Sequence, residues 1–181
     1  MPQPVGRPFS PGSAWALLAE LVGDDPTGLS APRRSQLRRH LRDADGHELA
    51  ARLGRCASRR LVYAHPSMLD NLAADPRVVL TGLAAAEHAG ARLVGTGNDE
   101  VEAYVAESDV AGPYTAYGLV DAQTVANVVL RVVDDPAHVP RRSGMAAAPV
   151  VGLDLWESGD ARASEEGQRL FADALGTLRE R

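Results

Sequence analysis

The chain has 181 residues, a hydrophobic fraction of 45% and a formal net charge of −5 at pH 7. This length allows one large domain or two small ones, and the composition is that of a globular protein. The single cysteine excludes a disulfide framework within the chain, and no apolar run approaches the ~20 residues of a membrane span. We therefore expect a cytoplasmic protein with no membrane partner.

Residues 1–12 contain four prolines, and we expect them to form a flexible arm. Ser13 is placed to cap a first helix through the sequence AWALLAELV, which ends near Gly23. A loop rich in turn-forming residues follows. Ser30 is placed to cap a second helix, with Pro32 in its first turn.

A third helix is predicted over residues 46–57, after the tight connection DADG. Leu49, Leu53 and Cys56 recur at helical spacing, which predicts one buried face and makes Cys56 a core residue rather than a nucleophile. The next residues, RLVYA, read as a short strand. Three helices followed by a strand are typical of a helix-turn-helix of the winged type.

Positive charge is concentrated in the second and third predicted helices. Residues 33–60 contain nine of the nineteen basic residues and only three acids, a formal charge of +6, whereas the rest of the chain carries −11. A solvated helix face is the alternative explanation, but such faces usually mix both signs, and residues 33–42 contain no acid. The charge therefore favours binding to nucleic acid.

In a helix-turn-helix the first helix of the motif crosses the DNA backbone and the second enters the major groove. We expect the second predicted helix to contact phosphates, which gives affinity that falls with salt, and the 46–57 helix to read base edges. The strand after it would return past the DNA backbone. The predicted DNA-binding residues are Arg33, Arg34, Arg38, Arg39, His47, Arg52, Arg55, Arg59 and Arg60.

From residue 77 the pattern changes to a mixture of strands and helices. RVVLTG, EVEAYVA and ANVVLRVVD predict strands, an alanine-rich helix follows the first of them, and AGPYTAYGLVDAQT is ambiguous. Ser164 followed by two glutamates predicts a capped amphipathic helix that closes the chain. We therefore expect an α+β fold: a helix-turn-helix (winged-helix-like) domain in residues 13–76, and an α/β domain with a small sheet and a C-terminal helix in residues 77–181, for dimerisation, effector or partner binding.

A second group of residues suggests an alternative function. Thr81 and Gly82 form a turn before the alanine-rich helix, and the next strand carries Glu100 and Glu102, which would project to one side. Small nucleotidyltransferases resemble this arrangement, with a strand bearing Asp-x-Asp for a divalent metal. The polar face of a half-buried strand is the simpler interpretation. A metal-dependent nucleotidyltransferase-like enzyme using Glu100 and Glu102 is the alternative to a DNA-binding protein.

Other catalytic patterns are missing from the sequence. The five histidines lack metal-ligand spacing, and neither a G-x-S-x-G turn nor a phosphate-binding loop is present. Asp154, Asp160 and Arg162 could form a polar joint, although a cap and turn before the last helix explain them equally well. We expect no catalytic residue, no cofactor and no metal.

Four stretches carry a resemblance to a known family: DPRVVLTGLAAAEHAGARL, VEAYV, NVVLRVV and APVVGLDLWESGDARASEEGQRLFADAL. They resemble the transcriptional regulators grouped with AbiEi-type antitoxins of type IV toxin–antitoxin systems, over about residues 45–175. The resemblance implies a winged helix before an α/β domain, DNA binding and repression, often of its own promoter. It also implies a C-terminal domain that counters a nucleotidyltransferase-like toxin.

These observations together predict a sequence-specific DNA-binding transcriptional regulator, a repressor with antitoxin-like autoregulation. Its partner would be double-stranded DNA, and one such module usually reads a site of useful length as a homodimer on a near-palindrome. A toxin or another protein would be a further partner.

Overall fold

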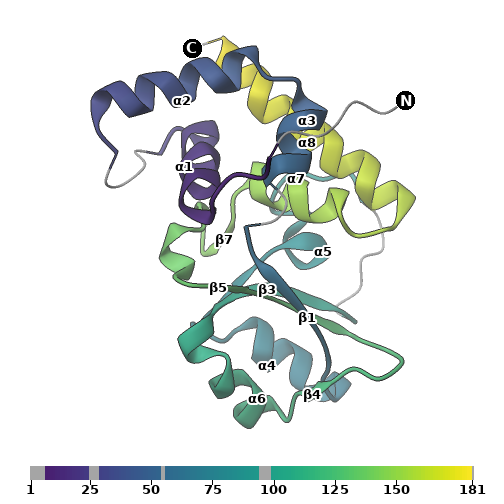
Figure 1. Ribbon diagram of the computed structural model, residues 1–181. Helices are drawn as coiled ribbons and strands as arrows, with labels where there is room; N and C mark the ends of the chain where they lie inside the picture. Colours follow the sequence, from purple (N-terminus) through teal and green to yellow (C-terminus); the bar gives the residue numbers. More distant parts are fainter. Residues whose placement is uncertain (1–6, 25–28, 54–55, 94–98, 181) are drawn as a thin grey trace.

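The computed structural model describes residues 7–24, 29–53, 56–93 and 99–180. Within these ranges the chain forms an α+β fold in which helices cover both faces of a five-stranded sheet (Figure 1). The α-helices are α1 (Pro11–Val22), α2 (Ala31–Asp43), α3 (Gly46–Leu53), α4 (Leu69–Ala73), α5 (Gly82–Ala85), α6 (Ala111–Tyr117), α7 (Ala148–Trp156) and α8 (Ala161–Arg179). The strands are β1 (Ser58–Tyr63), β2 (Val78–Leu80), β3 (Val101–Ala106), β4 (Val120–Asp121), β5 (Val128–Val133), β6 (Arg141–Arg142) and β7 (Met145–Ala146).

The three expected N-terminal helices are present, but two of their ends differ from the prediction. α1 begins at Pro11 because its N-cap is Ser10, whose hydroxyl accepts a hydrogen bond from the N–H of Ser13 at 3.4 Å. The predicted helix over 46–57 is too long, since α3 ends at Leu53. The chain leaves the helix there because it enters the sheet at Ser58, which pairs with Val132.

The sheet has the strand order β2-β3-β5-β1-β4. β3 and β5 run parallel, and the other neighbours run antiparallel. The strand expected to follow the helix-turn-helix, β1, therefore lies inside the main sheet between β5 and β4. The domain boundary expected at residue 76 falls between α4 and β2, and strands from both sides of it hydrogen-bond to each other in this sheet.

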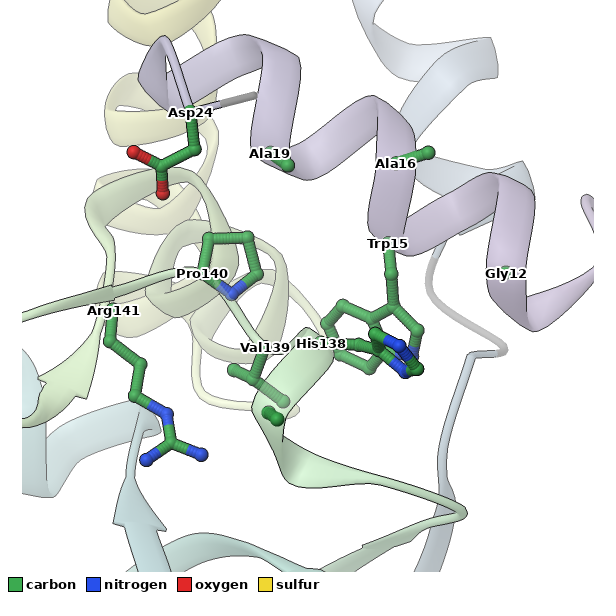
Figure 2. A pocket seen from close by; sticks show the side chains of 10 residues that line it. Gly12, Trp15, Ala16, Ala19, Asp24, His138, Val139, Pro140 and Arg141 are labelled. Carbon is green, nitrogen blue, oxygen red and sulfur yellow. The ribbon is translucent and has the colours of Figure 1, made fainter. Parts of the chain in front are cut away.

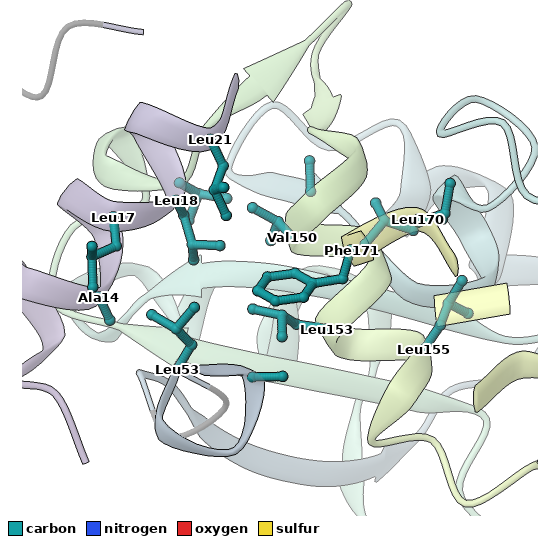
Figure 3. Packing of buried hydrophobic residues seen from close by; sticks show 14 of the residues in the cluster. Ala14, Leu17, Leu18, Leu21, Leu53, Val150, Leu153, Leu155, Leu170 and Phe171 are labelled. Atoms are coloured by element: carbon teal, nitrogen blue, oxygen red, sulfur yellow. The ribbon is translucent and has the colours of Figure 1, made fainter. Parts of the chain in front are cut away.

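Each face of the sheet has its own hydrophobic core. On one face α1, α3, α7 and α8 pack together, with Leu17, Leu53, Leu153 and Phe171 among the buried side chains (Figure 3). On the opposite face α4 and α6 cover the inward residues of β1, β3 and β5 (Figure 1). The N-terminal helices thus bury their apolar faces against helices from the end of the chain.

α7 and α8 approach each other closely at a pair of glycines. A Cβ atom on Gly167 would lie 2.6 Å from the backbone nitrogen of Trp156, and one on Gly152 would lie 2.9 Å from the carbonyl oxygen of Gly167. Real Cβ atoms do not make such contacts, so the absence of side chains at both positions permits this packing. α1 and α3 pack against this pair of helices.

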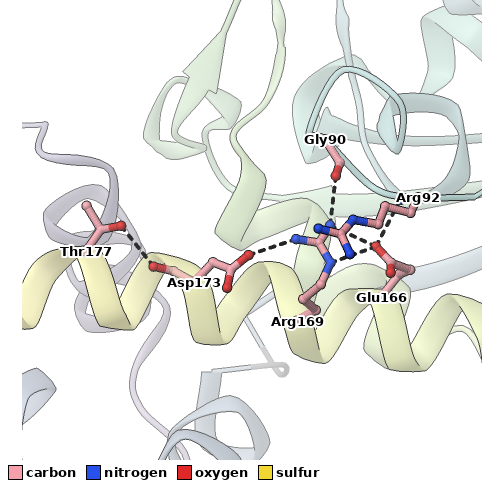
Figure 4. A network of polar contacts seen from close by, with 6 residues as sticks. All are labelled: Gly90, Arg92, Glu166, Arg169, Asp173 and Thr177. Carbon is pink, nitrogen blue, oxygen red and sulfur yellow. Dashed lines mark hydrogen bonds and ion pairs between the residues drawn. The ribbon is translucent and has the colours of Figure 1, made fainter.

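α8 begins three residues before the predicted cap at Ser164. Its N-cap is Asp160, whose carboxylate accepts from the N–H of Ala163 at 2.8 Å. Further along the helix, Arg169 bridges Glu166 and Asp173 and donates to the carbonyl of Gly90 at 2.8 Å (Figure 4). These contacts tie the outer side of α8 to the segment that follows α5.

None of the helices in the described ranges has the length and apolar character needed to cross a bilayer.

Candidate nucleic-acid interface

α2 carries most of the basic residues predicted to contact phosphates, and it lies at the edge of the molecule (Figure 1). Leu41 is its buried residue, while Arg33, Arg39 and Arg42 are exposed. The helix holds no acid before Asp43, its last residue. Its outer side is therefore a positively charged surface, and Arg33, Arg39 and Arg42 are called the α2 surface below.

Two other arginines of α2 face the protein. Glu20 of α1 is 2% exposed, and its Oε2 accepts a hydrogen bond from Nε of Arg38 at 2.6 Å. Nε of Arg34 lies 3.8 Å from Oε1 of the same carboxylate. Glu20 therefore offsets part of the charge of α2 and links α2 to α1. The side chain of Arg38 is nevertheless 51% exposed, so its guanidinium also reaches the surface.

The residues predicted to read bases have other neighbours. The ring of His47 lies 5.0 Å from that of Trp156. Arg52 places its guanidinium 4.1 Å from the ring centre of Phe9 and donates to the carbonyl of Arg7 at 3.1 Å, so Phe9 covers much of this side chain. Arg55 lies outside the described residues. α3 thus presents a mixed surface, on which Glu48 is also exposed.

Arg59 and Arg60 lie in β1 and are both exposed. They project to opposite faces of the sheet, because neighbouring residues in a strand alternate. Arg59 stands opposite Arg131 of β5, and Arg60 stands opposite Leu130. The two arginines therefore belong to the central sheet and not to a separate wing. Because they project to opposite faces, a ligand on one face of the sheet can contact only one of them.

The two glutamates of the enzyme alternative do not meet. Glu102 lies in β3 and its Oε1 accepts from Nε of Arg131 at 2.6 Å. Glu100 precedes β3, is exposed, and lines a depression together with Asp70 and Glu87. In the described residues no group of three or more His, Cys, Asp or Glu side chains is placed to hold a metal ion.

Arg131 is the centre of a buried polar cluster that the sequence patterns did not predict. This guanidinium also contacts Asp154 of α7 and Glu157, the C-cap residue of that helix, through Nη1, at 3.0 and 3.2 Å. Asp154 in turn accepts hydrogen bonds from the hydroxyls of Thr81 and Tyr104. Burial raises the pKa of Asp154 above the ordinary range of an aspartate, whereas Arg131 opposes this shift.

The cluster joins two stretches that are far apart in the sequence, the Thr81-Gly82 turn and the Asp154 segment. Gly82 has φ of +54° and its Cα faces Glu102 so closely that any Cβ atom would collide with that carboxylate. Nη2 of Arg131 is buried and has no hydrogen-bond partner among the described residues. Arg131 lies in β5, the middle strand of the sheet, and forms an ion pair with Glu102. This arrangement indicates that the cluster is an ion-paired core connecting the sheet to α7, rather than a metal site.

Cys56 packs against the core, as expected, although it lies beyond the end of α3. Burial raises the pKa of its thiol to about 12, and the negative charge of Asp154 acts in the same direction. A thiol with such a pKa is not ionised at neutral pH and is a poor nucleophile.

Comparison with known proteins adds no relative to this description: the chain matches no family model, no curated protein and no solved structure.

Proposed function

We propose that this protein is a DNA-binding regulator that contacts the phosphates of duplex DNA through the α2 surface. The observation that carries the proposal is the exposure of Arg33, Arg39 and Arg42 on a helix with no acid before its last residue, in a chain whose net charge is negative. Arginine binds phosphate oxygens through two N–H groups at once, and neutralised phosphates release counterions. The remaining surface repels DNA on average, so one side of the molecule would face it.

α2 has a stronger case than α3 as the main contact. The guanidinium of Arg52 is packed on Phe9, and the exposed residues of α3 include an acid, Glu48. Reading of base edges by α3 is therefore the finer part of the proposal and rests on the two-helix pattern and on His47. Repression of its own promoter and action as a dimer are also finer parts of the proposal.

The test is a fluorescence-anisotropy titration of labelled duplex DNA at several salt concentrations, without divalent metal. We expect the variant R33A/R39A/R42A to bind more weakly, and the slope of log K against log salt to fall by about one unit for each arginine that contacts a phosphate.

The matched control is R92A/R141A/R162A, which removes the same charge from exposed positions outside α2. It should retain most of the wild-type affinity. If the wild-type protein fails to bind duplex DNA at low salt, or if both triple variants lose affinity equally, the α2 surface is not a DNA-binding site.

A further inference from the structure

Three carboxylates share the guanidinium of Arg131. Glu102 accepts a hydrogen bond from its Nε at 2.6 Å, while Asp154 and Glu157 lie 3.0 and 3.2 Å from its Nη1. Because the same nitrogen contacts both Asp154 and Glu157, the two contacting oxygens lie no more than about 6 Å apart, within the range at which one carboxylate disfavours ionisation of another. If all three were ionised, two negative charges would lack a cation in a cluster where Arg131 and Asp154 are each 2% exposed.

The hydrogen bonds of Asp154 allow it to be protonated. The hydroxyls of Thr81 and Tyr104 contact its two oxygens. A hydroxyl both donates and accepts, so Thr81 can accept from a protonated Asp154 while Tyr104 still donates to it. Burial raises the pKa of Asp154, Arg131 opposes this rise, and the charge of Glu102 adds to it. A rise of about three pH units, which fully buried carboxyl groups reach, would bring the titration close to neutral pH.

The elements packed around the cluster add no further cation to it. Cys56, which precedes β1, stays neutral because burial raises the pKa of its thiol. α1 approaches with Trp15, whose ring centre lies 5.5 Å from that of Tyr104. Trp15 also lines a cavity of about 450 Å³ whose wall includes Asp24 and His138 (Figure 2). In the described part of the chain, the ion pairs of the three carboxylates all go to the single guanidinium of the cluster.

Glu157 is the member of the cluster that can move into water. It is the C-cap residue of α7, and its side chain is 35% exposed, compared with 14% for Glu102. The preceding residue, Trp156, contacts the ring of His47 in α3 at 5.0 Å. Departure of Glu157 would remove one negative charge from Arg131 and leave the hydrogen bonds of the sheet intact.

We propose that this cluster is a pH-sensitive switch that holds one proton on Asp154 and releases it to water as the pH rises through neutrality. Release of the proton leaves a negative charge beside Glu157, which then separates from Arg131 and loosens the C-terminal end of α7. The two events are linked, because any factor by which Glu157 favours the proton is also the factor by which loss of the proton disfavours the Glu157 contact. No residue of the α2 surface belongs to the cluster, so this inference and DNA binding can fail independently.

Carbon-13 NMR of the side-chain carboxyl groups in the full chain follows the proton directly. The variant D154N identifies the Asp154 signal by its absence. We expect this signal to titrate above about pH 6, two pH units above an ordinary aspartate. E157Q keeps an acceptor for Arg131 but removes the charge, so it should lower the midpoint by about one pH unit. The control E165Q, at an exposed position of α8, should leave the midpoint in place.

Amide hydrogen exchange measures the loosening of α7. The N–H groups of Glu157 and Ser158 donate to the carbonyls of Leu153 and Leu155, each at 3.1 Å. At about pH 8.5 these amides should exchange about tenfold faster in the wild type than in D154N, whose residue 154 carries no charge, and near pH 5 the two proteins should exchange alike. Comparison at the same pH cancels the intrinsic pH dependence of exchange, and both proteins retain His47.

Three results would overturn the proposal: an Asp154 midpoint below about pH 6, a midpoint that E157Q leaves unchanged, or equal exchange by wild type and D154N at about pH 8.5. If D154N fails to fold, the wild type and E157Q still decide. The switch then requires an aspartate signal that titrates above about pH 6 in the wild type and moves down in E157Q, and it is wrong if no such signal exists.

Discussion

The carboxylate of Glu20 in α1 accepts a hydrogen bond from Nε of Arg38 in α2 at 2.6 Å, and Glu20 is 2% exposed. A carboxylate is rarely buried in this way without a cationic partner, because removing it from water is costly. The contact explains why α2, whose inward face carries few apolar residues, stays attached to α1. It also reduces the charge that α2 presents to a ligand.

Replacing Glu20 by Gln should therefore destabilise the protein. We expect a loss of about 1–2 kcal/mol in the free energy of unfolding, the worth of a hydrogen bond to a charged group when one partner is half exposed. Urea denaturation measures this loss. The exposed Glu165 in α8 provides the control, since E165Q should change the stability by less than about 0.5 kcal/mol. Equal stability of E20Q and the wild type would mean that this ion pair contributes nothing.

Asp75 should make the stability of the protein depend on acid pH. The side chain of Arg77 donates to it at 2.5–3.1 Å, and the hydroxyl of Tyr117 donates to it at 2.8 Å. The Arg77 hydrogen bonds hold the pKa of Asp75 well below its usual range. The unfolded state then binds the proton more readily than the folded state, so this contribution is complete above the unfolded pKa of about 3.9 and disappears as the pH falls towards the folded pKa.

The variant D75N removes this difference. We expect the gap in urea midpoint between wild type and D75N to be largest at neutral pH and to narrow steadily below about pH 4. A gap that stays constant between about pH 6 and pH 2 would show that the carboxylate is not stabilised by Arg77.

Gly167 and Gly176 lie in the same helix and should respond oppositely to alanine. A Cβ atom at Gly167 would lie 2.6 Å from the backbone nitrogen of Trp156, whereas one at Gly176 would have no atom within 4 Å. G167A should cost about 1–3 kcal/mol of unfolding free energy, because α7 and α8 must separate. G176A should stabilise the protein by about 0.5–1 kcal/mol through the higher helix propensity of alanine. Thermal denaturation of the two variants distinguishes these outcomes, and similar values for both would contradict the close packing of α7 on α8.

Cys56 should resist alkylation. Because burial raises the pKa of its thiol to about 12, almost no thiolate is present near neutral pH. We expect iodoacetamide to modify the native protein at least about a hundredfold more slowly than the urea-denatured protein. Mass spectrometry after timed quenching gives both rates, and rapid labelling of the native protein would show that the thiol is accessible and ionised.

The sequence alone was sufficient where a local pattern decides the structure. Alternating or continuous apolar residues correctly predicted β3 and β5, helical spacing predicted α1 and α2, and the positive charge of residues 33–60 follows directly from their residue types. The ends of helices were less well predicted, because competing caps such as Ser10 and Ser13, or Asp160 and Ser164, differ only in which hydrogen bonds the backbone completes.

Only the tertiary structure decided how these pieces meet. Thr81 and Asp154 lie 73 positions apart in the chain and share a hydrogen bond, and Glu102 and Arg131 lie 29 positions apart on neighbouring parallel strands. No local periodicity encodes such contacts, because they depend on strand order. The division of the α2 arginines also depends on the tertiary structure. Because α1 packs beside α2, Arg34 and Arg38 lie next to Glu20, whereas Arg33, Arg39 and Arg42 remain exposed.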